Sequence, residues 1–166
     1  TKARNYFLDH LNMAEERKDH LGMVSALTNI GYTYMEEQNY EDALSSYTRA
    51  YDLVEEHELW HVAGTTLLNV GESYLNLGDR DRALTFFMRG LSSAKKQSEL
   101  AAVARGNGQL AKFYRQEKPD SALFYAKEAL RVADEIGSQE VTEKVAEVTY
   151  RLYENFGDYE NALNYY

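Results

Sequence analysis

The stretch ALTNIGYTYMEEQNYEDALSSYTRA at residues 26–50 recurs forty residues later as TLLNVGESYLNLGDRDRALTFFMRG at residues 66–90. The matched pairs are Leu27/Leu67, Asn29/Asn69, Gly31/Gly71, Tyr34/Tyr74, Ala43/Ala83, Leu44/Leu84, Tyr47/Phe87 and Arg49/Arg89. The same spacing continues through Ala3 and Phe7 before the stretch, through Leu110, Ala111, Tyr114, Ala122 and Leu123 after it, and finally through Tyr153, Ala162, Leu163 and Tyr166. One residue is lost between Tyr114 and Ala122. So many matches at one spacing indicate a repeated structural unit along the whole chain.

Each repeat is typical of two helices joined by a short turn. No stretch alternates with the period of a strand, and the single proline, Pro119, falls where a helix can begin without losing a hydrogen bond. The spacing predicts first helices near residues 20–36, 60–76, 99–116 and 138–154. It predicts second helices near residues 1–17, 40–56, 80–96, 119–135 and from 159 onward. The expected fold class is therefore all-α, a solenoid of stacked helical hairpins.

The order of small and aromatic residues in the repeat resembles the tetratricopeptide repeat. It runs from Gly31 and Tyr34, through a turn, to Ala43, Tyr47 and Ala50. The common tetratricopeptide repeat has about 34 residues, so this chain is more similar to the longer repeats of kinesin light chains and of bacterial peptide-sensing and membrane-anchored signalling proteins. The resemblance implies an α–α superhelix that binds protein or peptide in a concave groove. HEAT and armadillo repeats have similar periods and are the alternative fold.

The small residues predict where two helices cross closely. Gly31, Gly71 and Ala111 fall on first helices, and Ala43, Ala83, Ala122 and Ala162 fall on the second helices that face them. The space that these small residues leave is expected to be filled by the tyrosines of the first helices, which are Tyr34, Tyr74, Tyr114 and Tyr153. Because one hairpin cannot bury its apolar face alone, neighbouring repeats are expected to complete the core.

The repeat boundaries predict a single array over residues 1–166. It consists of a half repeat at 1–17 and four repeats at 20–56, 60–96, 99–135 and 138–166. The chain begins and ends inside second helices, and the polar capping elements of natural arrays are missing from it. We therefore expect a fragment of a longer protein.

Composition excludes several classes of partner. The net charge of −9 and the isoelectric point near 5.0 argue against nucleic acid, since phosphate binding relies on clustered Lys and Arg. No apolar run approaches the roughly 18–20 residues that cross a bilayer, so no membrane contact by this segment is expected. The chain has no cysteine, which excludes disulfide and thiolate sites. No motif indicates a cofactor, and nothing in the composition assigns a compartment.

Two motifs suggest chemistry, but neither is expected to perform it. His57-Glu58-Leu59-Trp60-His61 matches the H-E-x-x-H motif of zinc proteases, which requires both histidines on one helix. In the repeat frame this segment straddles a turn, so we expect neither a metal site nor catalytic residues. Gly106-Asn107-Gly108 lies inside a predicted first helix and matches no phosphate loop. It indicates either close helix packing or a groove floor that a ligand backbone approaches. No nucleophile–base set stands out, so the chain is not expected to be an enzyme.

In a tetratricopeptide array the first helices line the groove, and helical spacing predicts which side chains reach it. The candidate ligand-binding residues are Asn29, Tyr32, Asn69, Glu72, Arg105, Gln109, Lys112, Arg115, Lys144 and Arg151, with Val148 beside the last two. Asn29, Asn69 and Gln109 share one repeat position, and a carboxamide can both donate to and accept from an extended peptide backbone. The resemblance implies the same use, because asparagines at this position hold peptides in the longer repeats. The alternative is that these amides join neighbouring first helices.

The charges of this face suggest the kind of ligand. Basic residues gather in the third and fourth repeats of an otherwise acidic chain, at Arg105, Lys112, Arg115, Lys144 and Arg151. The same face of the first two repeats is nearly uncharged. A partner protein or extended peptide with an apolar stretch and an acidic end would fit this gradient.

The expected function is a protein- or peptide-binding module, as the sensor or scaffold part of a bacterial signalling or regulatory protein. The two-carboxylate clamp of chaperone-binding arrays would require Lys and Asn in place of Thr28 and Tyr32, so a chaperone tail is not the expected partner. The alternative function is structural, namely a homodimer formed through the open ends of the array.

Overall fold

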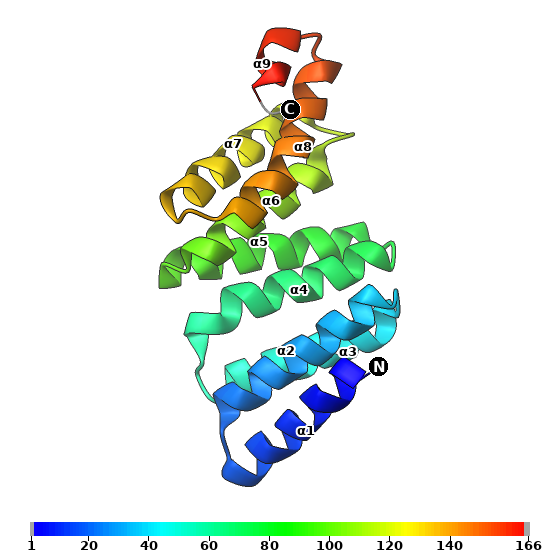
Figure 1. Ribbon diagram of the computed structural model, residues 1–166, viewed down its shortest axis with the longest axis vertical. Helices are drawn as coiled ribbons and strands as arrows, with labels where there is room; N and C mark the ends of the chain where they lie inside the picture. Colours follow the sequence, from blue (N-terminus) through cyan, green and yellow to red (C-terminus); the bar gives the residue numbers. More distant parts are fainter. Residues whose placement is uncertain (1, 165–166) are drawn as a thin grey trace. The chain divides into compact units, whose positions relative to one another are not determined.

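A computed structural model describes residues 2–164 (Figure 1). Its helices are α1 (Lys2–Arg17), α2 (His20–Glu36), α3 (Tyr40–Glu56), the short 3₁₀ helix η1 (Trp60–Val62), α4 (Ala63–Asn76), α5 (Arg80–Gln97), α6 (Leu100–Tyr114), α7 (Pro119–Glu135), α8 (Gln139–Asn155) and α9 (Tyr159–Leu163). The described residues are 85% helical and contain no strand, which confirms the predicted all-α fold of helical hairpins. Tyr166, which the spacing assigns to the last helix, lies outside the described residues. Within residues 2–164, no helix has both the length and the apolar character needed to cross a membrane.

The chain divides into two compact units, the first ending at Ser93 and the second beginning at Ala94. In the first unit, α1 packs on α2, α2 on α3 and α3 on α4. In the second unit, α6 packs on α7, α7 on α8 and α8 on α9, while α6 also contacts α8. The contact between α6 and α8 places two first helices of successive repeats side by side.

Most turns contain one residue in the left-handed conformation, and these residues recur at intervals of about twenty. They are Lys18, Gln38, Glu58, Gly78, Ser98, Gly137 and Gly157, all with positive φ. The conformation lets the next amide bond back to the preceding helix, as when the Asp79 N–H donates to the Tyr74 carbonyl at 2.9 Å. Lys118 is the exception, with φ −140°, because the residue before a proline is driven toward extended backbone. The turn before Pro119 is also the place where the sequence loses one residue.

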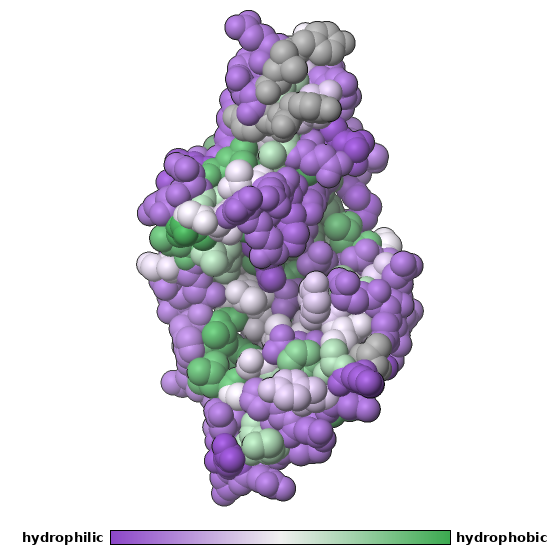
Figure 2. Space-filling model, in the orientation of Figure 1, coloured by the Kyte–Doolittle hydropathy of each residue, from purple (hydrophilic) through white to green (hydrophobic). Residues whose placement is uncertain are grey.

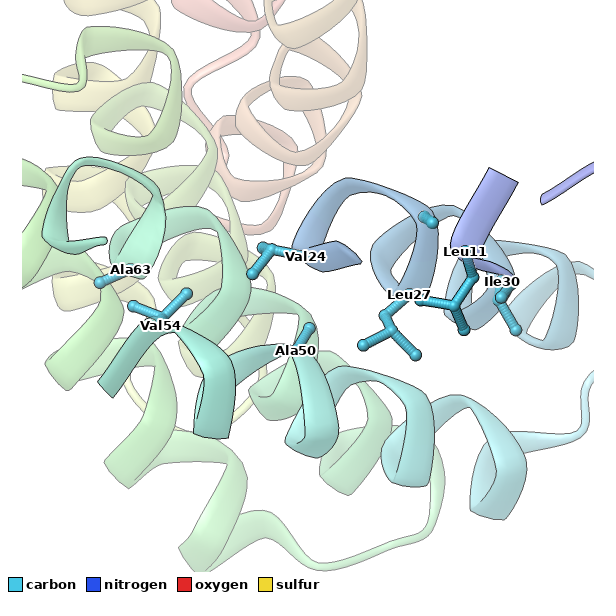
Figure 3. Packing of buried hydrophobic residues seen from close by; sticks show 8 residues of the cluster. Leu11, Val24, Leu27, Ile30, Ala50, Val54 and Ala63 are labelled. Carbon is cyan, nitrogen blue, oxygen red and sulfur yellow. The ribbon is translucent and has the colours of Figure 1, made fainter. Parts of the chain in front are cut away.

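The core of the first unit is formed by apolar side chains of four successive helices. Leu11 of α1 lies near Leu27 and Ile30 of α2, and Val54 of α3 lies near Ala63 at the start of α4 (Figure 3). Each of these side chains is at most 5% exposed. Burying one Leu, Ile or Val side chain stabilises the fold by about 1.5–3 kcal/mol, so the hairpins hold together mainly through this stripe.

The predicted close crossing of helices is present, but a different aromatic ring occupies it. The rings of Tyr47 and Phe87, on second helices, lie against Gly31 and Gly71, and they are 3% and 0% exposed. The expectation that the first-helix tyrosines fill this space was therefore wrong for these two repeats.

The first-helix tyrosines instead lie at the edge of the core, where most are only half-buried. A cation lies over each ring within 4.4–5.6 Å of its centroid; the pairs are Arg4/Tyr34, Arg82/Tyr74, Lys118/Tyr114 and Lys127/Tyr153. Such contacts contribute about 0.5–1 kcal/mol at exposed sites. These tyrosines therefore anchor basic side chains from neighbouring helices and turns.

The core of the second unit is built from smaller residues, which are Ala111, Ala122, Ala126, Ala129, Val145, Val148 and Leu152. Ala126 occupies the position of Tyr47 and Phe87 in the preceding repeats, and Ala111 occupies the position of their glycine partners. Where the aromatic ring is lost, the facing glycine has thus become alanine. Val148, which spacing assigns to the groove face, is buried in this core, and its assignment to the groove was wrong.

Candidate functional site

The three carboxamides at the shared repeat position differ in their environments. Asn29 on α2 is half-buried, whereas Asn69 on α4 and Gln109 on α6 are only 6% and 8% exposed. The side chains of Asn29 and Gln109 make no hydrogen bond to the described residues, yet none of their polar atoms is sealed from solvent. Asn69 is already engaged in an interaction within the protein. Two of the three amides therefore have free bonding capacity.

The other candidates in the first unit lie on the same two first helices. Tyr32 on α2 is 60% exposed, and Glu72 on α4 is half-buried. Below them, the Ser73 hydroxyl donates to Sδ of Met35 at 3.7 Å, which ties α4 to α2. The face combines an exposed aromatic ring with polar groups and carries little charge.

The basic candidates on α8 are largely neutralised by their own helix. Lys144 Nζ lies 2.7 Å from Oε1 of Glu140, and Arg151 Nη2 lies 2.8 Å from Oε1 of Glu147, both one turn earlier. The hydrogen bond from Lys144 holds the pKa of Glu140 below its usual range, and the charge of Arg105 acts in the same direction. The acidic residues of α8 thus offset much of the positive charge that the sequence assigns to this helix.

The cations at the C-terminal end of α6 are different. Lys112 is exposed and Arg115 is half-buried at the end of the helix. Neither forms an ion pair or hydrogen bond within residues 2–164. Positive charge available to a ligand is therefore found on α6 more than on α8.

Arg115 and Arg151 line one pocket of about 490 Å³ in the second unit. Its other walls are formed by Gln116, Pro119, Glu154, Asn155 and Phe156. The structure thus brings together two candidates from different first helices. Pro119 and Phe156 were missed by sequence reasoning because Pro119 begins the second helix α7 and Phe156 follows α8, so neither lies on the first-helix faces from which groove residues were predicted.

A second pocket, of about 600 Å³, lies in the first unit and was not predicted. It is lined by Leu44, Tyr74, the turn residues 77–79 and residues 80–82 at the start of α5. Asp79 caps α5 there by accepting hydrogen bonds from the backbone N–H and the Nε of Arg82. Because Arg82 is held by Asp79 and lies over the Tyr74 ring, its charge is already satisfied within the protein.

On one face of the molecule, hydrophilic residues cover most of the surface and apolar residues show in small patches (Figure 2).

The H-E-x-x-H segment does not lie on one helix. His57 follows the last residue of α3 as its C-cap, Glu58 adopts a left-handed φ of 53°, and His61 lies in η1. The ring of His57 stacks on the ring of His20, with centroids 3.5 Å apart. Among the described residues, no group of three or more His, Asp or Glu side chains could hold a metal ion.

The Gly106-Asn107-Gly108 segment is buried inside α6. The Asn107 Nδ2 donates to the Val103 carbonyl at 2.8 Å. A Cβ added to Gly108 would lie 3.0 Å from Cγ2 of Val145 on α8. These contacts favour the close-packing interpretation of this segment over a groove floor.

Three solved structures show the same fold as this chain. BtubC from P. vanneervenii matches with a TM-score of 0.80 and 18% identity, covering 99% of this chain and 69% of that one. Aspartyl phosphate phosphatase F from Bacillus subtilis matches with a TM-score of 0.75 and 14% identity, covering 98% and 52%. The Rap conjugation gene regulator of plasmid pLS20, solved with the Phr* peptide, matches with a TM-score of 0.69 and 18% identity, covering 98% and 51%. The chain thus spans about half the length of the last two proteins.

The family comparison identifies the repeat itself. Residues 26–58 and 64–97 each match a tetratricopeptide repeat model. No curated protein matches the sequence closely enough to be counted as a relative. The helical hairpins and the contacts between small and aromatic residues are consistent with the same repeat. The tetratricopeptide fold is a scaffold for protein interaction. Residues 26–58 and 64–97 are therefore tetratricopeptide repeats, and the repeats and the shared fold together support a protein-interaction repeat module.

Proposed function

We propose that this module binds an extended peptide or peptide-like segment of a partner protein along its first helices. The observation that carries the proposal is made in each unit separately: neither the Asn29 carboxamide on α2 nor the Gln109 carboxamide on α6, which share one repeat position, forms a hydrogen bond with the described residues. A polar group this close to the core normally has a partner, since a lost hydrogen bond costs about 1–3 kcal/mol. Solvent access supplies that partner in the free protein, and a peptide backbone would supply it in the complex.

A carboxamide is suited to sequence-tolerant recognition. It offers an N–H donor and a carbonyl acceptor, which match the acceptor and donor of a peptide group whatever its side chain. Specificity would then come from neighbouring residues, such as the exposed ring of Tyr32 in the first unit and the cations of α6 in the second. The engaged amide of Asn69 would have a structural role.

The solved neighbours support a peptide ligand. The pLS20 regulator was solved with the Phr* peptide. Nearly the whole of this chain, 98%, shares the fold of about half of that regulator, 51%. By analogy we propose that the chain is the sensor or scaffold part of a bacterial signalling protein and performs no catalysis itself.

The test is a screen of the purified protein against an array of random decapeptides, followed by titration of the peptides that bind. Asn29→Ala and Gln109→Ala should each weaken binding by about 10-fold, the consequence of losing one hydrogen-bonding partner. Asn12→Ala is the matched control, because Asn12 is an exposed asparagine on α1. An array without binders, or binders unaffected by both substitutions, would contradict the proposal.

Self-association is the second candidate function, and exposed apolar residues of α1 favour it. Tyr6 is 70% exposed, and Leu8 and Met13 are also exposed. Ala3 is exposed although the equivalent Ala43 and Ala83 are fully buried. Sedimentation equilibrium distinguishes the candidates: a dimer that Tyr6→Ser dissociates would favour self-association, and a monomer at micromolar concentration would exclude it.

A further inference from the structure

The pocket at the ends of α6 and α8 contains an arginine without an ion pair among residues 2–164. Most other basic side chains of the second unit contact an acidic or aromatic side chain of the same unit. The ion pairs are Arg131 with Glu128 and Glu135, Lys144 with Glu140, and Arg151 with Glu147, and Lys118 and Lys127 lie over tyrosine rings. Arg115 is half-buried in the pocket wall and has no such contact among the described residues. A partly desolvated guanidinium without a counter-charge is a favourable place for an anion.

Arg151 adds a second guanidinium to the same pocket. One of its five N–H donors is used by Glu147, so the remaining donors stay available. The acidic side chain in the pocket wall is Glu154, which accepts a hydrogen bond from the Tyr150 hydroxyl at 3.3 Å. Because Glu147 already offsets the charge of Arg151, the pocket's cation without an ion pair among the described residues is Arg115, and Arg151 adds its remaining N–H donors.

The pocket also has an apolar wall. Phe156, which follows α8, is 44% exposed, and Pro119 begins α7 beside it. The carboxamides of Gln116 and Asn155 complete the lining. A volume of about 490 Å³ lies within the usual range of ligand pockets, about 300–1,000 Å³.

We propose that this pocket binds a carboxylate of the peptide ligand, and that the carboxylate is the C-terminal one. The inference rests on the proposed peptide-binding function and names the part of the ligand that this site recognises. A C-terminal residue presents its carboxylate and its side chain from the same carbon atom. The carboxylate would bind the guanidinium groups of the pocket and the side chain would pack on the ring of Phe156. The carboxamides of Gln116 and Asn155 would form hydrogen bonds with the last peptide group of the ligand. An internal Asp or Glu would bring the charge without the adjacent apolar group.

The experiment compares two arrays of the same random decapeptides, one synthesised with free C-terminal acids and one with C-terminal amides. Free acids with an apolar last residue should bind at least about 10-fold more tightly than the matched amides, as expected when a charged hydrogen-bonding pair is lost. Binding of the free acids should weaken at high salt. Amides that bind as well as the acids overturn the terminal assignment, whether or not internal Asp residues contribute. If neither array contains a binder, the proposed function fails together with this inference.

Variants locate the effect in the pocket. Arg115→Gln should weaken the free acids by about 10-fold or more and change the amides by less than about twofold. Glu154→Gln should act in the opposite direction and tighten the free acids, because it removes the negative charge from the pocket wall. Arg131→Gln is the matched control, since it removes the same charge from the same unit outside the pocket. A uniform change in acid and amide binding, or an equal effect of Arg131→Gln, overturns the site assignment.

Folding does not limit the test. The acid–amide comparison needs only the unmodified protein, and Arg115 makes no hydrogen bond or ion pair within the described residues that its replacement would remove. Should Arg115→Gln nevertheless unfold, Arg151→Gln removes the second guanidinium of the pocket from an exposed position. An Arg151→Gln protein that still discriminates acids from amides as strongly as the unmodified protein overturns the role of this pair.

Discussion

The ring of Tyr47 lies so close to Gly31 that a methyl group added to this glycine would stand 2.5 Å from Cε1 of Tyr47. Phe87 bears the same relation to Gly71, where the added carbon would stand 2.7 Å from Cδ1. In the third repeat both partners are alanine, at Ala111 and Ala126, and both are fully buried. The volume at this crossing is therefore shared between two helices, and a change on one side requires a compensating change on the other.

Gly71→Ala should destabilise the protein by about 1–3 kcal/mol, the usual effect of inserting a carbon into a filled core. The gain of up to about 1 kcal/mol in helix propensity from replacing glycine would not offset it. Urea unfolding measures the change. Phe87→Ala alone should cost about 3–5 kcal/mol, and the double variant should be more stable than the sum of the two changes predicts. Strict additivity would show that the ring and the glycine are not coupled.

Gln38→Gly should stabilise the protein by about 0.5–1 kcal/mol. Gln38 has a φ of 58° in the turn between α2 and α3, a conformation that costs a non-glycine residue about 1–2 kcal/mol. Gly78 occupies the equivalent turn of the next repeat with φ 83°. A Cβ added to Gly78 would have no atom of another residue within 4 Å. The reciprocal change, Gly78→Gln, should therefore destabilise through the backbone alone. Equal melting temperatures for the two variants would contradict this account.

Acid should selectively weaken the cap of α5. Hydrogen bonds from the backbone and side chain of Arg82 lower the pKa of Asp79. Because the folded pKa lies below the unfolded one, the stabilising contribution is complete above the ordinary aspartate pKa. It is lost as the pH falls through the lowered value. Melting temperatures recorded from pH 7 to pH 3 should show this loss for the unmodified protein. In Asp79→Asn, which keeps the cap without the charge, this contribution to the pH dependence should be absent; an unchanged profile would contradict it.

The sequence was a good guide to the helices and a poorer guide to the site, for a physical reason. Helix positions follow from a spacing that recurs in every repeat, and errors at one repeat are corrected by the others. Whether an amide has a partner depends on individual neighbours: Asn29 and Asn69 share one repeat position, yet within the described part of the chain Asn69 is engaged and the Asn29 side chain has no hydrogen-bonding partner. The same applies to Lys144 and Arg151, whose charges are offset by glutamates on their own helix. A pattern could have found those pairs, since each lies four residues from its partner.

Tyr47 and Phe156 illustrate what spacing does not resolve. The small–aromatic order contains two aromatic positions, and only the relative orientation of the helices decides which ring covers the glycine. Phe156 lies after the last helical residue of α8, so a helical-face argument does not include it. Its exposure in the pocket follows from the path of the turn.

The purified protein should not bind zinc stoichiometrically. His57 and His61 lie on opposite sides of a turn, and His57 stacks on His20, so the two imidazoles do not share a helical face as a zinc-protease motif requires. Equilibrium dialysis followed by elemental analysis is the measurement, with His10→Ala as the control, since His10 is a half-buried histidine on α1 outside the motif. One equivalent of tightly bound zinc that His61→Ala removes would contradict this prediction.

Asn69→Ala should reduce the stability of the protein and Gln109→Ala should reduce its affinity for peptide, although the two residues share one repeat position. Asn69 is nearly buried and engaged within the protein, so its truncation should cost about 1–3 kcal/mol of folding free energy. Gln109 has no hydrogen-bonding partner among the described residues, so Gln109→Ala should change the free energy of unfolding by much less. It should instead weaken peptide binding by about 10-fold, and Asn69→Ala should leave the affinity of the folded fraction nearly unchanged. Urea unfolding gives the first quantity and peptide titration at a temperature well below unfolding gives the second. A Gln109→Ala protein with lost stability and full affinity would show that the third amide, like Asn69, belongs to the fold, and the peptide would then have to be held elsewhere.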